Sequence, residues 1–228
     1  MVNSILFISD SHGTDYGVKS YVSLISEKHT KKVKKICYGG MPIDYFIEKV
    51  SLLDKSEKVD LTIIQIGNPD VHPRMPHKVL KHLRSKGLKF CRDSLFSIPP
   101  TLNLSYLLRF PFFLFRLLLI RFYQEYYNSI NEIQSKLAII IRDLERISKK
   151  IIIVPLFKIN SFVYGDYHNK NVDMVNSFLS NNYPDYFLTS ANLNYEIYKK
   201  QFNLDGFHFN DRFHYKLSEE LITLMKRV

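Results

Sequence analysis

The chain has 228 residues, which suits one large domain with a buried core better than two full domains. Hydrophobic residues make up 46% of it and charged residues 24%, and this ordinary composition excludes a disordered chain, a collagen-like repeat and a coiled-coil rod. Lysine and arginine total 32 against 22 acidic residues, so the net charge is +10. Such a charge favours anionic partners, whether phosphorylated metabolites, nucleic acid or a membrane surface.

The cysteines and the terminal segment indicate a reducing compartment. Cys37 and Cys91 have neither the spacing of a zinc site nor that of a disulfide framework. The first residues lack the basic region of a secretory signal, and the most apolar segment, 110–122, contains a proline and two arginines. We therefore expect a cytoplasmic protein without a transmembrane anchor, and contact with the inner face of the membrane stays open.

Short apolar, β-branched runs alternate with stretches of helical spacing. Parallel strands that are covered on both faces have nearly continuous apolar sequences of this kind. The expected strands are Ser4–Ile8, Val33–Tyr38, Leu61–Ile66, Lys150–Phe157 and a weaker one at Tyr186–Thr189. Apolar stripes at helical spacing run through 130–147 and 217–225. The sequence therefore predicts a single domain over 1–228, a three-layer α/β/α sandwich of the flavodoxin-like kind with a five-stranded, mostly parallel sheet.

The segment from about 70 to 127 is longer than a simple crossover between the third and fourth strands requires. Prolines divide it, so we expect a helical insertion of two or three helices that shapes the substrate side of the domain. Within it, 106–127 carries a broad apolar helical surface on which Arg109 and Arg116 share a face. We expect this helix to cover the sheet, and docking on a bilayer interface is the alternative.

A serine follows the first strand at the edge where an α/β sheet opens its crevice, in Ser9-Asp10-Ser11. Ser11 is the candidate nucleophile, and its hydroxyl needs an imidazole and oxyanion donors. Asp205 precedes His208 by three residues in a loop before the last helix, so His208 is the candidate base and Asp205 the residue that orients it. His12 and His214 compete for the base role with less favourable positions.

Glycines and an asparagine stand where the second and third strands end. The backbone N–H groups of Gly39 and Gly40 can approach a ligand closely, and the side-chain amide of Asn68 is a further candidate oxyanion donor. The competing interpretation of the serine turn is a helix cap, and Asp10 is expected to brace the turn by accepting backbone hydrogen bonds. Two cysteines and scattered histidines give no metal-ligand pattern, and we expect neither a metal nor another cofactor.

The short motifs at these strand ends and in the last loop, taken in chain order, resemble the conserved sequence blocks of the SGNH, or GDSL-type, hydrolase superfamily. Ser9-Asp10-Ser11 lacks the first glycine of the family's Gly-Asp-Ser block, whereas Asp205 and His208 match its Asp-x-x-His block. Gly67-Asn68-Pro69-Asp70 keeps both ends of the Gly-x-Asn-Asp block but shifts the asparagine forward by one. The resemblance implies a catalytic triad of Ser11, His208 and Asp205. It also implies an oxyanion hole of the backbone N–H groups of Ser11 and Gly40, with Gly39 as the alternative to Gly40, and of the Asn68 side chain. Because Pro69 cannot donate a hydrogen bond, the third oxyanion donor is in question.

The variant third block and the following Pro73-Arg74 look like SGNH-like proteins of bacterial surface-polysaccharide gene sets. That resemblance implies a carbohydrate esterase or O-acyltransferase working on a surface-polysaccharide precursor through an acyl-enzyme. Asp70 and Arg74 are candidate substrate contacts, and the guanidinium fork suits a nucleotide-, lipid- or coenzyme A-linked substrate. A catalytically impaired module that binds a glycan or a partner enzyme is the alternative. Nucleic-acid binding ranks last because the positive charge is scattered.

Overall fold

The computed structural model describes residues 2–29, 32–86, 97, 102, 104–188 and 201–227. In these ranges, four parallel strands form one sheet in the order β2-β1-β3-β4. The strands are β1 (Ser4–Ser9), β2 (Lys32–Cys37), β3 (Val59–Gln65) and β4 (Ser148–Ile153). Each overlaps a predicted strand, and the parallel α/β fold class is confirmed.

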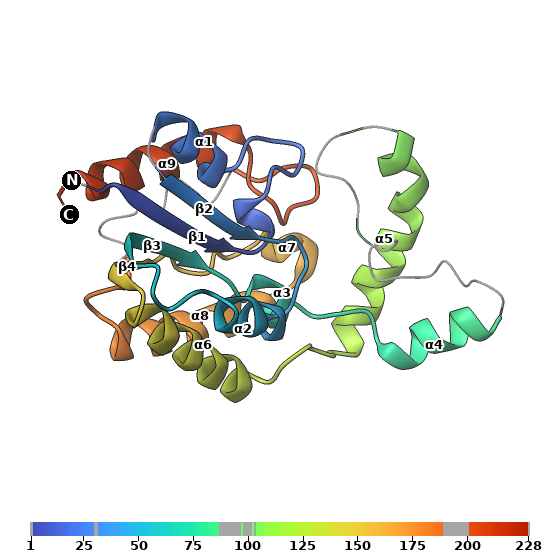
Figure 1. The fold of residues 1–228 in the computed structure, drawn as a ribbon. Helices are drawn as coiled ribbons and strands as arrows, with labels where there is room; N and C mark the ends of the chain where they lie inside the picture. Colours follow the sequence, from blue (N-terminus) through green and yellow to red (C-terminus); the bar gives the residue numbers. More distant parts are fainter. Residues whose placement is uncertain are drawn as a thin grey trace.

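Helices cover both faces of the sheet (Figure 1). One face packs against α1 (Tyr21–Lys28) and α9 (Asp211–Met225), and the other against α2 (Ile43–Ser51), α6 (Ile130–Glu145) and α8 (Tyr167–Asn182). Side chains alternate between the faces along β1, so that Phe7 joins the α1/α9 core and Ile8 joins the α2/α6/α8 core. The three layers predicted from the apolar runs are thus present.

A fifth parallel segment lies at the edge beyond β4, as a single bridge. Phe187 pairs with Ile153, because the N–H of Ile153 donates to the carbonyl of Tyr186 and the N–H of Leu188 donates to the carbonyl of Ile153. The predicted fifth strand begins at this place. Its last residue, Thr189, lies outside the described residues, so the described sheet has four strands and one bridge instead of five full strands.

The described helices between β3 and α6 are the short α3 (Asn68–Val71), α4 (His77–Ser85) and α5 (Leu104–Phe122). Of these, α4 and α5 stand to one side of the sheet (Figure 1). The expectation that the segment around 106–127 covers the sheet is wrong. α5 instead packs against α7 (Ser161–Tyr164), where Phe113 and Ile120 form a small separate core with Ile159 and Tyr164. In the part of the chain that is described, no helix has both the length and the apolar character needed to cross a bilayer.

Candidate active site

The strand order places a crevice between β1 and β3. Chain connections leave β1 toward β2 on one side and β3 toward β4 on the other, and ligands of open parallel sheets bind at such a switch point, outside the carboxyl ends of the strands. Ser9 and Gln65 are paired at the ends of these strands, and the N–H of Asp10 donates to the carbonyl of Gln65 at 3.1 Å. The turn with Ser11 and the loop with Asn68 therefore leave the sheet side by side.

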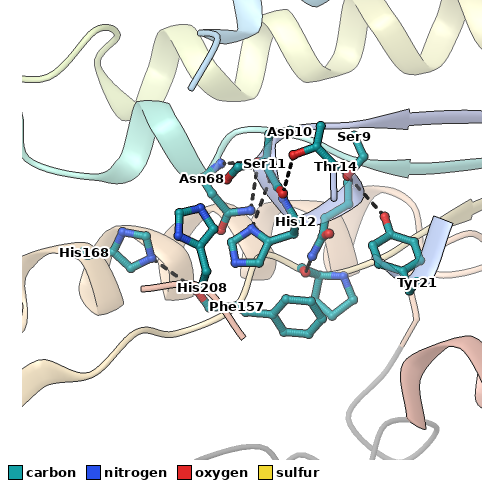
Figure 2. Close-up of polar contacts among 12 residues, drawn as sticks. Ser9, Asp10, Ser11, His12, Thr14, Tyr21, Asn68, Phe157, His168 and His208 are labelled. Atoms are coloured by element: carbon teal, nitrogen blue, oxygen red, sulfur yellow. Dashed lines mark hydrogen bonds and ion pairs between the residues drawn. The ribbon is translucent and has the colours of Figure 1, made fainter. Parts of the chain in front are cut away.

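Asp10 joins these two loops through a wholly buried carboxylate (Figure 2). One oxygen accepts from the backbone N–H of His12 and lies 3.2 Å from Nδ1 of the same residue. The other oxygen accepts from the backbone N–H of Asn68 at 3.1 Å and from its side-chain amide at 2.9 Å. Burial raises the pKa of Asp10, but the hydrogen bonds and charge of His12 and the bond from Asn68 outweigh it, so the pKa is lowered and the ionised form favoured.

Ser11 opens a single turn of 3₁₀ helix, Ser11–Gly13, that Asp10 caps. Ser11 is 8% exposed and lines a cavity of about 430 Å³. Gly39 and Gly40, which follow β2, line the same cavity, and the backbone of Gly39 lies against Ser11. The predicted nucleophile and the predicted Gly40 donor are thus brought to one wall.

Asp205 and His208 meet in a tight turn before α9. Nδ1 of His208 lies 2.6 Å from one oxygen of Asp205, whose other oxygen accepts from the backbone N–H of His208 and of Phe207. Gly206, between them, has φ +67°, a left-handed conformation that a side chain at Cβ disfavours, so the glycine permits the turn. An ionised carboxylate only accepts, so Asp205 holds the proton of His208 on Nδ1 and leaves Nε2 as an acceptor.

One tyrosine packs on the imidazole of His208, and another holds the turn that carries it. The ring of Tyr16 packs on it with centroids 4.5 Å apart, and the hydroxyl of Tyr164 donates to the carbonyl of Asp205 at 2.7 Å. His208 lies beside the ring of His12 at a centroid separation of 5.7 Å, next to the Ser11 turn (Figure 2). Ser11, Asp205 and His208 all line the same cavity.

The competing histidines are placed elsewhere. His12 is buried against Asp10 and several aromatic rings, and does not line the cavity. His214 is buried on α9, where Nδ1 accepts from the backbone N–H of Tyr21, and burial lowers the pKa of His214 to about 3. Of the imidazoles that line the described cavity, His208 carries a carboxylate partner, whereas His72 is surrounded by rings and burial lowers its pKa.

Two predicted site residues have different surroundings from those expected. Asp70 is wholly buried away from the cavity, where one oxygen accepts from the backbone N–H of Ile43 at the start of α2 and the other from the amide of Asn128. The predicted substrate contact of Asp70 is therefore corrected to a scaffold role. Burial raises its pKa to about 6, against the opposing bonds from Asn128 and Ile43. Asn68 also lies inside the protein, and its amide already donates one bond to Asp10.

Arg74 does reach the cavity, as predicted. Its Nε and Nη2 donate to the carbonyl oxygen of Pro69 at 3.1 and 2.7 Å, and the guanidinium lies over the ring of Tyr127 at 4.2 Å. These contacts fix the plane of the guanidinium while the side chain borders the cavity. A guanidinium held in this way presents a directed fork to a carboxylate or phosphate.

Several lining residues were not singled out as site residues. Arg109 and Arg116 reach the cavity from α5, and Tyr16, His72 and Tyr164 border it from three other segments. The sequence places the two arginines on one face of a helix, but it does not indicate which side of the domain that face meets. For the others, the sequence carries no such signal, because their position depends on how distant segments pack.

No protein-family model matches the chain, and no curated protein matches it significantly in sequence. Solved structures do match over nearly the whole length. A lipase/acylhydrolase from Enterococcus faecalis has a TM-score of 0.60 at 12% identity, covering 98% of this chain and 95% of that one. A psychrotrophic esterase from Pseudoalteromonas sp., solved with monoethylphosphonate as inhibitor, has a TM-score of 0.57 at 12% identity, covering 99% and 97%.

The acetylxylan esterase Axe2 from Geobacillus stearothermophilus matches with a TM-score of 0.57 at 14% identity, covering 97% of this chain and 93% of that one. One solved variant of that esterase is a catalytic mutant in which alanine replaces a serine. At sequence identities this low, the matches show a shared fold and not a shared activity. The chain therefore has the α/β fold of these lipase/acylhydrolase and esterase structures.

Proposed function

We propose that the protein is a serine-dependent esterase or acyltransferase that acts on an O-acylated carbohydrate through an acyl-enzyme. The observation that carries the proposal is the Asp205–His208 pair, which lines the same cavity as Ser11 at the switch point of the sheet. Likeness of fold to an acetylxylan esterase supports the choice of an acylated sugar as substrate class.

In the proposed reaction, the hydroxyl oxygen of Ser11 attacks the ester carbonyl while Nε2 of His208 accepts the hydroxyl proton. Asp205 keeps the other proton on Nδ1 and stabilises the imidazolium that forms. The proton passes to the leaving alkoxide as the tetrahedral intermediate collapses to the acyl-enzyme. Water, or a hydroxyl of an acceptor sugar, then attacks the acyl group and loses its proton to His208. His208 gives that proton to the departing oxygen of Ser11, which restores the free enzyme.

Backbone N–H groups of Ser11 and Gly40, which line the cavity, would hold the oxyanion. The third donor would be the second amide hydrogen of Asn68, the first being bound to Asp10, and a substrate must uncover it because the Asn68 side chain is wholly buried and does not line the described cavity. Arginines at positions 74, 109 and 116 all border the cavity, which favours a substrate with a phosphate or carboxylate near its ester. A nucleotide-, lipid- or coenzyme A-linked precursor of a surface polysaccharide has this chemistry.

A catalytically impaired module that binds a glycan or partner enzyme is the second candidate. Pro69 occupies the position of the family's asparagine and has no N–H, and the neighbouring Asn68 is committed in part to Asp10. Removing one oxyanion donor slows a hydrolase by about 10²–10³-fold. The two candidates therefore differ in the chemical reactivity of Ser11.

A fluorophosphonate probe separates the two candidates, because it phosphonylates only an activated serine. We expect stoichiometric labelling, read by intact-protein mass spectrometry, that is lost in Ser11→Ala and at least about 10³-fold slower in His208→Ala. The matched control is Ser97→Ala, which removes another serine that lines the cavity and should still label. Folded protein that never labels would refute the enzyme and favour the binding module.

A further inference from the structure

The outer face of α5 is apolar along its whole length. The exposed fractions of its side chains lie between 40% and 72% for Leu104, Leu107, Leu108, Phe112, Leu114, Phe115, Leu118 and Phe122. At 100° per residue these positions fall within an arc of about 160°. No arginine of the helix falls inside that arc, because Arg109 and Arg116 turn to the cavity and Arg121 lies at its edge.

The opposite face of α5 is the one that the protein uses. Phe113 and Ile120 are buried against α7, and Arg116 is buried beside the cavity. The helix stands to the side of the domain, away from the sheet and its covering helices (Figure 1). A run of exposed leucine and phenylalanine this long is unusual on a monomer surface and marks an interaction surface.

A basic rim adjoins this face. Val79 and Leu83 of α4 and Leu119 of α5 all pack against a small buried cluster of Met75 and Leu80, so α4 lies beside α5 and turns its other side outward. Lys78 and Lys81 are exposed on that side. The chain as a whole carries a net charge of +10. An apolar helical face bordered by lysines has the pattern of a helix that lies in the headgroup region of an anionic bilayer.

We propose that α5 and α4 dock the protein on the surface of an anionic lipid bilayer, with α5 parallel to the membrane plane. In this orientation, the leucine and phenylalanine side chains enter the acyl boundary and the lysines of α4 meet the lipid phosphates. Arg109 and Arg116 line the cavity from the same helix, so the cavity adjoins the side of α5 that faces away from the membrane. Docking itself does not rest on the proposed esterase activity.

Vesicle sedimentation tests the proposal with the full chain. We expect binding to vesicles of 70% phosphatidylcholine and 30% phosphatidylglycerol that weakens as salt rises, and at least about tenfold weaker binding to pure phosphatidylcholine. Leu108→Glu should weaken binding at least about tenfold, because a carboxylate replaces a leucine that enters the acyl region. Leu52→Glu is the matched control, since Leu52 is also exposed, at 71%, but lies at the end of α2.

Three results would overturn the proposal. They are no sedimentation with anionic vesicles, equal binding to neutral vesicles, and an equal loss in Leu52→Glu. Sedimentation velocity without lipid could also overturn it. A dimer that Leu108→Glu dissociates would show that a second copy of the chain, and not a bilayer, covers this face of α5. Should Leu108→Glu fail to fold by circular dichroism, Lys78→Gln with Lys81→Gln must reduce binding to anionic vesicles. Ser11→Ala should bind like the wild type, which separates docking from catalysis.

Discussion

Replacing Asp10 by asparagine tests the buried link between the two loops of the candidate site. Each carboxylate oxygen of Asp10 serves one residue, one oxygen His12 and the other Asn68. Asparagine has nearly the same shape but keeps a single oxygen. Whichever way the new amide turns, its NH₂ group faces the backbone N–H of either His12 or Asn68, and that donor loses its acceptor.

The expected loss of stability follows from this geometry. A buried backbone N–H left without an acceptor costs about 1–3 kcal/mol, and bonds that go from a charged to a neutral acceptor each lose about 1 kcal/mol. The asparagine variant no longer buries a charge, which offsets part of this loss of stability. The offset is incomplete, because the lowered pKa of Asp10 means that its hydrogen bonds more than compensate for the burial of its carboxylate. We expect Asp10→Asn to reduce the free energy of unfolding by about 2–4 kcal/mol, within the range for breaking a buried charged network.

Urea unfolding followed by far-ultraviolet circular dichroism measures this change, since the chain has no tryptophan. Asp173→Asn is the matched control, because Asp173 is an exposed partner of Lys158 and its replacement should change stability by less than about 0.5 kcal/mol. Fluorophosphonate labelling of the folded Asp10→Asn variant should also slow, as Asn68 loses its anchor. A variant as stable as the control would refute the bracing role of Asp10.

Two further predictions concern Asp70 and Arg74. Burial raises the pKa of Asp70 from 3.8 to about 6, so the folded state holds more protons than the unfolded state between these values and stability falls as pH rises through them, by about 3 kcal/mol in total. Asp70→Asn should abolish this part of the pH dependence in urea unfolding, and an unchanged slope would contradict the burial argument. Pyrophosphate bound in the cavity should protect Ser11 from labelling by the fluorophosphonate probe. Arg74→Gln should raise the pyrophosphate concentration needed for half protection by about tenfold, the effect of one charged hydrogen bond. Equal protection would show that Arg74 does not bind the anion.

The sheet and the order of site residues along it could be predicted from the sequence. Nearly continuous apolar runs such as Leu61–Ile66 leave few alternatives to a buried parallel strand, and the carboxyl ends of such strands meet at one edge. The short spacing of Asp205 and His208 likewise restricts them to one local turn. These predictions succeed because each depends on neighbours in the chain.

The predictions that failed depend on contacts between distant segments. Apolar character told us that α5 buries some surface, but the same composition fits a helix on the sheet and a helix packed on α7 with an exposed outer face. For Asp70, proximity to the crevice suggested a substrate contact, whereas the start of α2 and Asn128, both far along the chain, provide its partners. Neither partner can be identified from spacing.

The unusual Gly67-Asn68-Pro69-Asp70 order is explained by the local structure that it forms. Gly67, with φ +115°, turns the chain sharply at the end of β3, and Asn68 then starts α3 and reaches Asp10 with both backbone and side chain. Pro69 lies in the first turn of α3, where a backbone N–H would have no carbonyl acceptor within the helix. The carbonyl oxygen of Pro69 accepts a hydrogen bond from the guanidinium of Arg74.

The same four residues bear on how an oxyanion would be held. In this arrangement, the asparagine braces the turn that carries Ser11. Its side chain is wholly buried and does not line the described cavity, so only the amide hydrogen not bound to Asp10 is left, for a substrate that uncovers it. An asparagine at position 68 therefore has its side-chain amide tied to the carboxylate of Asp10, which caps the Ser11 turn. Loss of Asp10 should disturb the nucleophile and this donor together, whereas loss of the Asp205–His208 pair should leave both in place and remove only the base.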